Sequence, residues 1–210
     1  MYIISMISKK GGVGKSTIAR ALAAELSKNN FEVKLADLDV KQGTCINWYQ
    51  NRLSKELGAI SSVEFINDKK MNRIIKNDEY DFLIIDTEAK AEKQTLKLAK
   101  LSNLIIQPSG PSNDDLIPGV KLFRALVEAG INKNKMYFVM NRIGTKTERR
   151  DTEEYINYAG YKYIDGCIYE SPSYRAVQNT GKAITENPYK GPRIQAEIVM
   201  QSIIDSIDSE

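Results

Sequence analysis

The chain has 210 residues, of which 42% are hydrophobic and 27% are charged, and this suits a single domain, residues 1–210, with a well-buried core. Its formal net charge of +3 permits contact with nucleic acid without requiring it. Histidine is absent, so any hydrolytic chemistry must rest on carboxylates, lysines, a metal ion and positioned water rather than on imidazole.

Apolar runs alternate with amphipathic stretches along the chain. Strands are predicted at residues 2–7, 33–36, 63–66, 82–85, 104–107, 136–140 and 163–168. Helices are predicted at residues 17–29, 44–57, 69–76, 91–101, 114–129, 147–159, 173–180 and 192–207, with a Pro- and Gly-containing loop at 187–192. Continuous rather than alternating apolar strands favour a mostly parallel sheet with helices on both faces. The sequence therefore predicts a doubly wound α/β fold whose ligand lies at the carboxyl ends of the strands.

The segment 9–17, Lys-Lys-Gly-Gly-Val-Gly-Lys-Ser-Thr, joins the first predicted strand to the first predicted helix. Its glycines let the backbone turn successive N–H groups toward one anion, and the helix adds the positive end of its dipole. Lys15 is expected to reach the β- and γ-phosphates of a nucleotide, and the Ser16 hydroxyl to bind Mg²⁺. An ordinary P-loop has glycine five residues before Gly14, where this chain has Lys9, and a second lysine, Lys10, precedes the glycine pair.

The pattern Lys-Gly-Gly-x-Gly-Lys-Ser/Thr resembles the deviant Walker A loop of the ParA/MinD family of ATPases, whose members have a P-loop NTPase fold. The resemblance implies that ATP and Mg²⁺ are the cofactors. It also implies that Lys10 reaches across an ATP-dependent homodimer to the phosphates of the partner subunit. The alternative is a solvated lysine on a glycine turn. By the same resemblance the nucleotide is bound by Gly11, Gly12, Val13, Gly14, Lys15, Ser16 and Thr17.

Asp37-Leu38-Asp39 closes the second predicted strand, where a carboxylate can contact Mg²⁺ or orient a water. It resembles the Asp-x-Asp-Pro-Gln motif of the family, which assigns Asp39 to positioning the attacking water and to the metal, and Asp37 to a supporting role. Val40 replaces the proline and Lys41 is inserted before the glutamine. The alternative is that both aspartates cap the next turn.

The segment 80–86, Tyr-Asp-Phe-Leu-Ile-Ile-Asp, is an apolar strand that ends in a carboxylate. This is the Walker B pattern, in which Asp86 supports Mg²⁺ through its water shell. Glu88, two residues later, either approaches the phosphates or the dimer interface or is a solvated loop residue.

Asn141-Arg142 follows the sixth predicted strand and resembles the Asn-Arg pair of the family, whose asparagine holds the adenine edge. A side-chain amide supplies both the donor and the acceptor that adenine requires. The alternative for Asn141 is a turn residue at the strand end. Pro108 and the segment 111–115 resemble the loop that flanks the nucleotide in this family.

The final predicted helix, 192–207, is expected to dock on the core rather than on a membrane, because the chain ends with the acidic residues Asp205, Asp208 and Glu210. No apolar run approaches the ~18 residues that span a bilayer, and Met1 leads directly into an apolar run rather than a signal peptide. Cys45 and Cys167 lack the paired spacing of a metal or cluster site and are expected to be free thiols in a reducing cytoplasm.

The chain is most similar to the short, ParF-like ParA proteins of plasmid partition. The resemblance implies a cytoplasmic, nucleoid-associated ATPase that dimerises on ATP, binds DNA without sequence preference and is activated by a centromere-binding, ParB-like partner. Candidate DNA contacts, each of which can also be a solvated helix residue, are Arg149, Arg150, Arg175 and Lys182. The alternatives are a MinD-like, cargo-positioning nucleotide switch and a dethiobiotin-synthetase-like metabolic enzyme.

Overall fold

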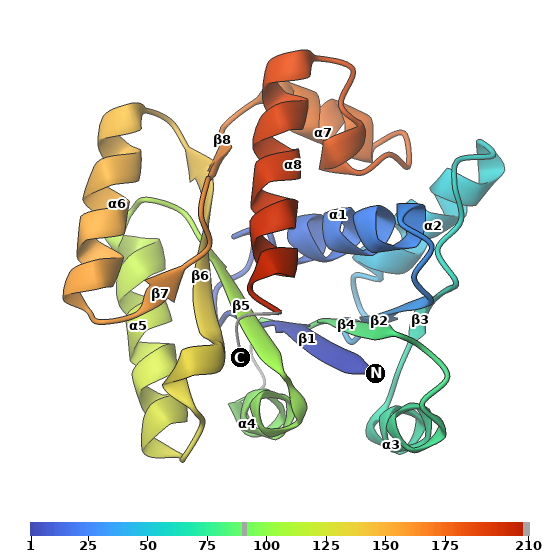
Figure 1. Cartoon of the computed structure of the whole chain (residues 1–210), viewed down its shortest axis with the longest axis horizontal. Coiled ribbons are helices and arrows are strands. Elements are labelled where there is room, and N and C mark those ends of the chain that lie inside the picture. Colours follow the sequence, from blue (N-terminus) through green and yellow to red (C-terminus); the bar gives the residue numbers. More distant parts are fainter. Residues whose placement is uncertain (90–91, 208–210) are drawn as a thin grey trace.

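A parallel β-sheet forms the centre of the protein in the computed structural model, which describes residues 1–89 and 92–207. Its strand order is β3-β2-β4-β1-β5-β6-β7, and β8 pairs with the far end of β6 (Figure 1). The strands are β1 (Tyr2–Met6), β2 (Val33–Asp37), β3 (Ser62–Phe65), β4 (Phe82–Asp86), β5 (Leu104–Ser109), β6 (Met136–Ile143), β7 (Lys162–Tyr163) and β8 (Ile168–Tyr169).

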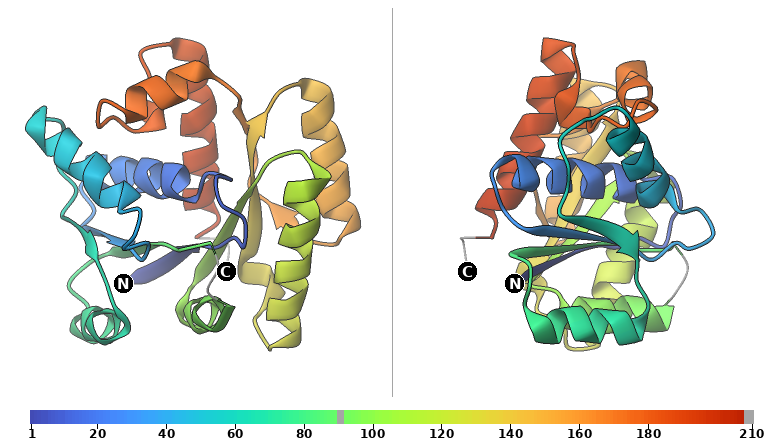
Figure 2. Two further views of the ribbon diagram at one scale, coloured as in Figure 1. Left: turned by 180° about the vertical axis from the view of Figure 1, so that it is seen from behind. Right: turned by 90° about the vertical axis from the view of Figure 1, so that its right-hand side faces the viewer.

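Helices cover both faces of this sheet (Figure 2). One face carries α1 (Lys15–Lys28), α2 (Thr44–Ser54), α7 (Pro172–Gln178) and α8 (Lys190–Asp205), whose buried side chains share one apolar cluster with the strands. The other face carries α3 (Asp68–Asn77), α4 (Glu92–Leu101), α5 (Asn113–Glu128) and α6 (Lys146–Tyr158). The predicted doubly wound, mostly parallel fold is confirmed.

The central position of β1 places the glycine-rich loop beside two acidic strand ends. In the sheet register Met6 pairs with Asp86, and Asp37 pairs with the same aspartate from the other side. Because β1, β2 and β4 are parallel and buried, their carboxyl ends meet at one edge of the sheet. The topology therefore gathers the loop and both aspartates at the crevice where open α/β sheets bind ligands.

Two elements differ from the predictions. The strand expected at 163–168 is instead two short strands, β7 and β8, because the chain turns at Gly166, whose φ is +81°. The last helix begins at Lys190, inside the expected loop 187–192, so Pro192 lies in its first turn. A proline is tolerated there because the first N–H groups of a helix have no intrahelical acceptor.

The last helix packs on the core as predicted, through Ala196, Val199, Met200 and Ile203. In the described part of the chain, no helix combines the length and apolar character needed to cross a membrane. The predicted helix start at residue 91 and the acidic residues Asp208 and Glu210 lie outside the described residues.

Candidate nucleotide and metal site

The loop between β1 and α1 has a backbone that only glycine accommodates at its end. Gly14 precedes the first residue of α1 with φ +107°, and a Cβ there would lie 2.2 Å from Asn141 Nδ2. The helix begins with the bond from Ile18 N–H to the Gly14 carbonyl, and no side chain caps its N-terminus. The first N–H groups of α1 are therefore directed at a ligand, which is how helix N-termini bind phosphate.

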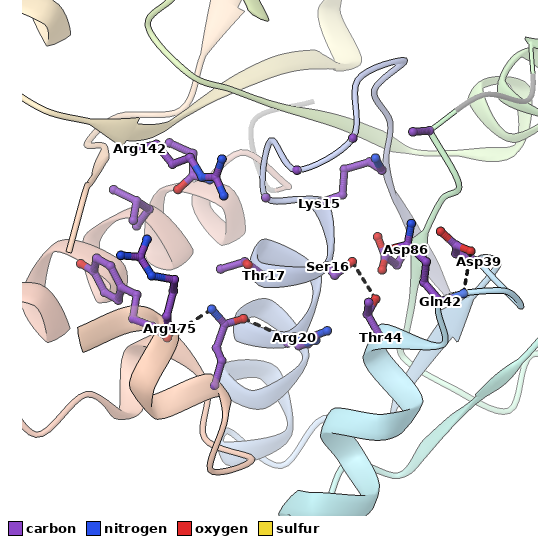
Figure 3. Close-up of a pocket in the computed structure, with 18 of the residues that line it drawn as sticks. Lys15, Ser16, Thr17, Arg20, Asp39, Gln42, Thr44, Asp86, Arg142 and Arg175 are labelled. Atoms are coloured by element: carbon purple, nitrogen blue, oxygen red, sulfur yellow. Dashed lines mark hydrogen bonds between the residues drawn. The ribbon is translucent and has the colours of Figure 1, made fainter. Parts of the chain in front are cut away.

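A pocket of about 320 Å³ opens at this loop (Figure 3). It brings together most of the residues predicted from the motifs, on the carboxyl ends of β1, β2, β4 and β6. Val13 and Lys10 are not among the residues that line it. Those that do include Gly11, Gly12, Gly14, Lys15, Ser16, Thr17, Asp39, Asp86, Asn141 and Arg142.

Lys15 is buried at the floor of the pocket, at the first position of α1. Its Nζ donates a hydrogen bond of 3.4 Å to the Lys10 carbonyl. Burial lowers the pKa of Lys15, and the charges of Asp86 and Asp39 oppose that shift. A nearby anion stabilises a buried ammonium, so the Lys15 side chain is suited to bind a phosphate.

Asp86 is the last residue of β4, and only one of its two carboxylate oxygens has a hydrogen-bond partner. Its Oδ2 accepts a hydrogen bond of 3.2 Å from Cys45 Sγ, whereas Oδ1 is buried and has no hydrogen-bond partner. Burial raises the pKa of Asp86, although the nearby hydroxyl of Ser16 and the thiol of Cys45 act against that shift. The Ser16 hydroxyl lies beside it and accepts a hydrogen bond of 3.1 Å from Thr44 Oγ1. Hydroxyl and carboxylate oxygens are the ligands that Mg²⁺ prefers, so these residues fit that ion.

Asp37 and Asp39 have separate positions. Asp37 is fully buried and its two oxygens accept the N–H groups of Asp39 (3.0 Å) and Cys45 (2.9 Å). Burial raises the pKa of Asp37, and these backbone hydrogen bonds oppose the shift. Asp39 lines the pocket, and its Oδ1 accepts the Gln42 N–H at 3.1 Å. Asp37 therefore supports the loop, while Asp39 both caps a turn and faces the pocket.

Lys10 points away from the pocket, onto the first turn of α5. Its Nζ lies 2.6 Å from Asp115 Oδ1 and 3.2 Å from the Asp114 carbonyl. That carbonyl is available because Pro118, four residues later in α5, has no N–H to donate to it. Gly110 provides the necessary space, since a Cβ there would lie 2.3 Å from Asp115 Oδ2.

Asn141 and Arg142 approach the glycine-rich loop from the end of β6. Asn141 is buried, and its Nδ2 donates a 2.7 Å hydrogen bond to the Val13 carbonyl, so at least one amide hydrogen holds the loop itself. Arg142 has a φ of +57°, a left-handed conformation that costs a non-glycine residue roughly 1–3 kcal/mol. This backbone directs its exposed side chain into the pocket, close to Gly12.

The far end of the pocket contains residues that the sequence motifs did not reveal. Arg20 of α1 (Figure 3) donates a 3.3 Å hydrogen bond to Gln178 Oε1 of α7. Tyr169 of β8 lines the pocket together with these two residues. Arg175, predicted to contact DNA, also lines this end and lies 3.8 Å from Glu170. Of these residues, Tyr169 has a signal in the sequence, because it ends a strand at the pocket edge of the sheet.

The other predicted DNA contacts lie elsewhere. Arg149 and Arg150 belong to α6, which lies on the other side of α8 from α7 (Figure 1 and the left view of Figure 2). Arg149 Nε pairs with Glu153 at 2.6 Å, and Arg150 Nη2 pairs with Asp151 at 3.1 Å. Lys182 follows α7, and its carbonyl accepts the Trp48 Nε1–H. The four residues therefore do not form one continuous patch.

A glycine-rich loop at a helix N-terminus, beside the acidic ends of parallel strands, defines a P-loop nucleotide-binding fold. The family described as "CobQ/CobB/MinD/ParA nucleotide binding domain" matches residues 4–184, and the chain belongs to this family.

Similar proteins agree with this assignment. The chain is 25% identical over 130 residues to Protein ParA of Rhizobium radiobacter, a match that covers 61% of this chain and 57% of that protein. It is 30% identical over 118 residues to an uncharacterized protein of Methanocaldococcus jannaschii, covering 51% and 46% of the two chains. The chain thus spans about half the length of the curated relatives it matches.

Solved structures share the fold over nearly the whole chain. The cell division protein MinD of Aquifex aeolicus superposes with a TM-score of 0.77 at 17% identity, covering 98% of both chains. A ParA family ATPase of Chlorobium tepidum gives a TM-score of 0.70 at 18% identity, covering 96% of this chain and 98% of that one.

Proposed function

We propose that this protein is a Mg²⁺-dependent ATPase that dimerises when it binds ATP, binds DNA without sequence preference and segregates plasmid or chromosomal DNA. Hydrolysis is stimulated by a centromere-binding, ParB-like partner. Membership of the family and the similarity to Protein ParA support this proposal. Structural relatives have been solved as an ATP complex of McdA and a Mg-ADP complex of MinD, and the residues around Ser16 and Asp86 fit the same kind of ligand.

The position of Lys10 carries the proposal of a dimer. Its side chain is 41% exposed and its ammonium lies on α5, outside the pocket that contains Lys15. In this position Lys10 does not contact the nucleotide pocket of its own subunit, although it belongs to the glycine-rich loop that binds the phosphates. Its charge is therefore available to the triphosphate of a second subunit.

The proposed chemistry depends on charge and position. Lys15 and the partner subunit's Lys10 stabilise negative charge on the transferring phosphoryl group, and Asp39 orients the attacking water. Ser16 and Asp86 would hold Mg²⁺, which would neutralise charge on the phosphates. No strong general base is required, because the transition state is largely dissociative. Turnover should be slow in the monomer, which lacks the second lysine.

We expect adenine to lie between Asn141 and Arg142, which approach the glycine-rich loop, and the part of the pocket lined by Tyr169 and Arg175. Arg149, Arg150 and Lys182 remain the proposed DNA contacts. Ion pairs with acidic neighbours compensate part of the charge of both α6 arginines, so we expect DNA binding of moderate strength that depends steeply on salt.

The experiment that tests the proposal measures DNA binding with ATP, with ADP and without nucleotide, across a salt series. Binding that requires ATP and weakens as salt rises is expected. Binding that is unaffected by nucleotide would overturn the partition cycle. ATP turnover that depends on a small organic substrate and ignores DNA would instead identify a metabolic enzyme.

Lys10→Ala provides the second test, with Lys9→Ala as the matched control in the same loop. Lys10→Ala should retain nucleotide binding but lose ATP-dependent dimerisation, measured by light scattering after size exclusion, together with hydrolysis. ATP-dependent dimers that persist in Lys10→Ala would refute the role of Lys10 in trans.

The ion pairing of the α6 arginines also favours a second candidate, a nucleotide switch that positions a protein cargo rather than DNA. The cell division protein MinD of Aquifex aeolicus has been solved in complex with another protein, MinC. ATP-dependent dimers that fail to bind DNA at low salt would favour this candidate.

A further inference from the structure

Cys45 lies directly beneath the proposed metal site, in the first turn of α2. Its side chain is fully buried, and its Sγ donates to Asp86 Oδ2 at 3.2 Å. Its backbone N–H donates to Asp37 Oδ2 at 2.9 Å. Cys45 therefore contacts the aspartates that end β4 and β2 at the same time.

The hydrogen bond from the thiol distinguishes the two oxygens of Asp86. Oδ2 has a donor, whereas Oδ1 is buried without a hydrogen-bond partner. A buried carboxylate oxygen without a donor is costly, and an ion or its bound water satisfies it. The thiol thus holds one oxygen in place and leaves the other available.

The neighbouring residue on α2 acts on the second oxygen donor of the site. Thr44 Oγ1 donates to Ser16 Oγ at 3.1 Å, so consecutive residues contact the two groups that fit Mg²⁺ (Figure 3). The segment that carries Asp39 and Gln42 leads directly into α2, and Asp39 O accepts the Gly43 N–H at 2.7 Å. This segment is therefore connected through Thr44 and Cys45 to both groups.

We propose that Cys45 is a positioning residue for Asp86: its thiol orients the carboxylate so that Oδ1 faces the Mg²⁺ that accompanies the nucleotide. The inference rests on the proposed Mg²⁺–nucleotide site and adds a residue that none of the motifs contains. Groups that orient metal-binding side chains typically change metal affinity about 10-fold or more when they are removed.

The test compares Cys45→Val, which is apolar, has no donor and is one methyl group larger, with Cys45→Ser, which keeps a donor. Cys167→Val is the matched control, since Cys167 is the other buried cysteine and lines a pocket other than the one that contains Ser16 and Asp86. A fluorescent ATP analogue is titrated in EDTA to measure nucleotide binding alone, and Mg²⁺ is then titrated at fixed analogue.

Cys45→Val should raise the half-saturating Mg²⁺ concentration about 10-fold while leaving the affinity in EDTA unchanged. Cys45→Ser should return to within about threefold of wild type, and Cys167→Val should match wild type. Equal Mg²⁺ dependence in Cys45→Val and wild type, or equal losses in Cys45→Val and Cys45→Ser, would overturn the inference. If the wild-type protein bound no nucleotide, that result would instead contradict the proposed function.

The infrared S–H stretching band of Cys45, recorded in Cys167→Val protein, gives a readout that requires no Cys45 variant. A donated hydrogen bond lowers the frequency of this band. We expect a lowered band in the free protein, a further change when Mg²⁺ and nucleotide are added, and no change when nucleotide is added in EDTA. A band at the frequency of a free thiol would overturn the inference even if Cys45→Val failed to fold.

Discussion

The two ends of the nucleotide pocket are built in different ways. The phosphate end is a short continuous segment from Gly11 to Thr17, supported by the ends of two adjacent strands. The far end brings α1 together with β6, β8 and α7, which begin more than a hundred residues after α1 ends: Arg20, for example, contacts Gln178. The first depends on local backbone conformation, the second on how distant elements pack.

This difference predicts where substitutions act. Changes at the phosphate end should remove binding outright, because a charge or a backbone conformation is lost. Changes at the far end should act through stability or modest changes in affinity.

Lys15→Ala should lower nucleotide affinity about 100-fold or more, because two charge-assisted hydrogen bonds to phosphate are each worth roughly 1.5–3 kcal/mol. Isothermal titration with ATP measures the loss. Lys41→Ala, at an exposed position of the neighbouring loop, should bind as wild type does. Affinity retained within threefold in Lys15→Ala would refute the assignment of the phosphate end.

Glu186→Gln should lower the free energy of unfolding by about 3 kcal/mol, because it leaves the buried Arg52 without its bidentate partner. Urea denaturation at pH 7 measures the difference. Burial acts to raise the pKa of Glu186, but hydrogen bonds from Arg52 and the Ala183 N–H outweigh it, and the pKa lies below its ordinary value of 4.5.

The lowered pKa of Glu186 makes the free energy of unfolding depend on pH. The stability that ionised Glu186 contributes is fully present above pH 4.5 and is lost as the pH falls through its lowered pKa. Wild type and Glu186→Gln should therefore converge in stability below pH 4.5. A difference that stays constant down to the acid transition would contradict this account.

Asn141→Ala should weaken nucleotide binding about 5-fold, since the Val13 carbonyl loses its 2.7 Å hydrogen bond and the loop loses a support worth about 1 kcal/mol. Asn157→Ala, on the exposed side of α6, is the control. A change in ATP affinity without a comparable change for GTP would instead show that the amide mainly reads the base.

Asp115→Asn should favour the ATP-dependent dimer about threefold, because the ion pair that holds Lys10 on α5 is half-exposed and worth at most about 1 kcal/mol. Sedimentation at several protein concentrations measures the dimer dissociation constant. Asp114→Asn makes the same change of charge but keeps the carbonyl that accepts from Lys10, and should have no effect. A weaker dimer in Asp115→Asn would mean that Asp115 acts within the interface.

Arg175→Ala should lower nucleotide affinity by about twofold to threefold, since its guanidinium is exposed at the pocket edge. Arg150→Ala should leave nucleotide affinity unchanged and reduce the salt dependence of DNA binding. If Arg175→Ala weakened DNA binding alone, Arg175 would return to the predicted DNA contacts.

Much of the fold and of the phosphate end could be predicted from the sequence. The buried strands are continuous apolar runs, and the glycine spacing together with Lys15, Ser16 and Asp86 is set by local backbone geometry and by the chemistry of phosphate and Mg²⁺. The prediction of a single strand at 163–168 was wrong, because a turn at Gly166 divides this segment into two short strands.

Only the tertiary structure decided the contacts between distant residues. No local pattern indicates that Cys45 donates to Asp86, that Pro118 frees a carbonyl for Lys10, or that Arg175 faces the pocket. Backbone conformation and hydrophobic periodicity depend on neighbours along the chain, so a sequence pattern can indicate them. These contacts instead join residues far apart in the sequence, because the strand order of the sheet brings remote elements to one edge.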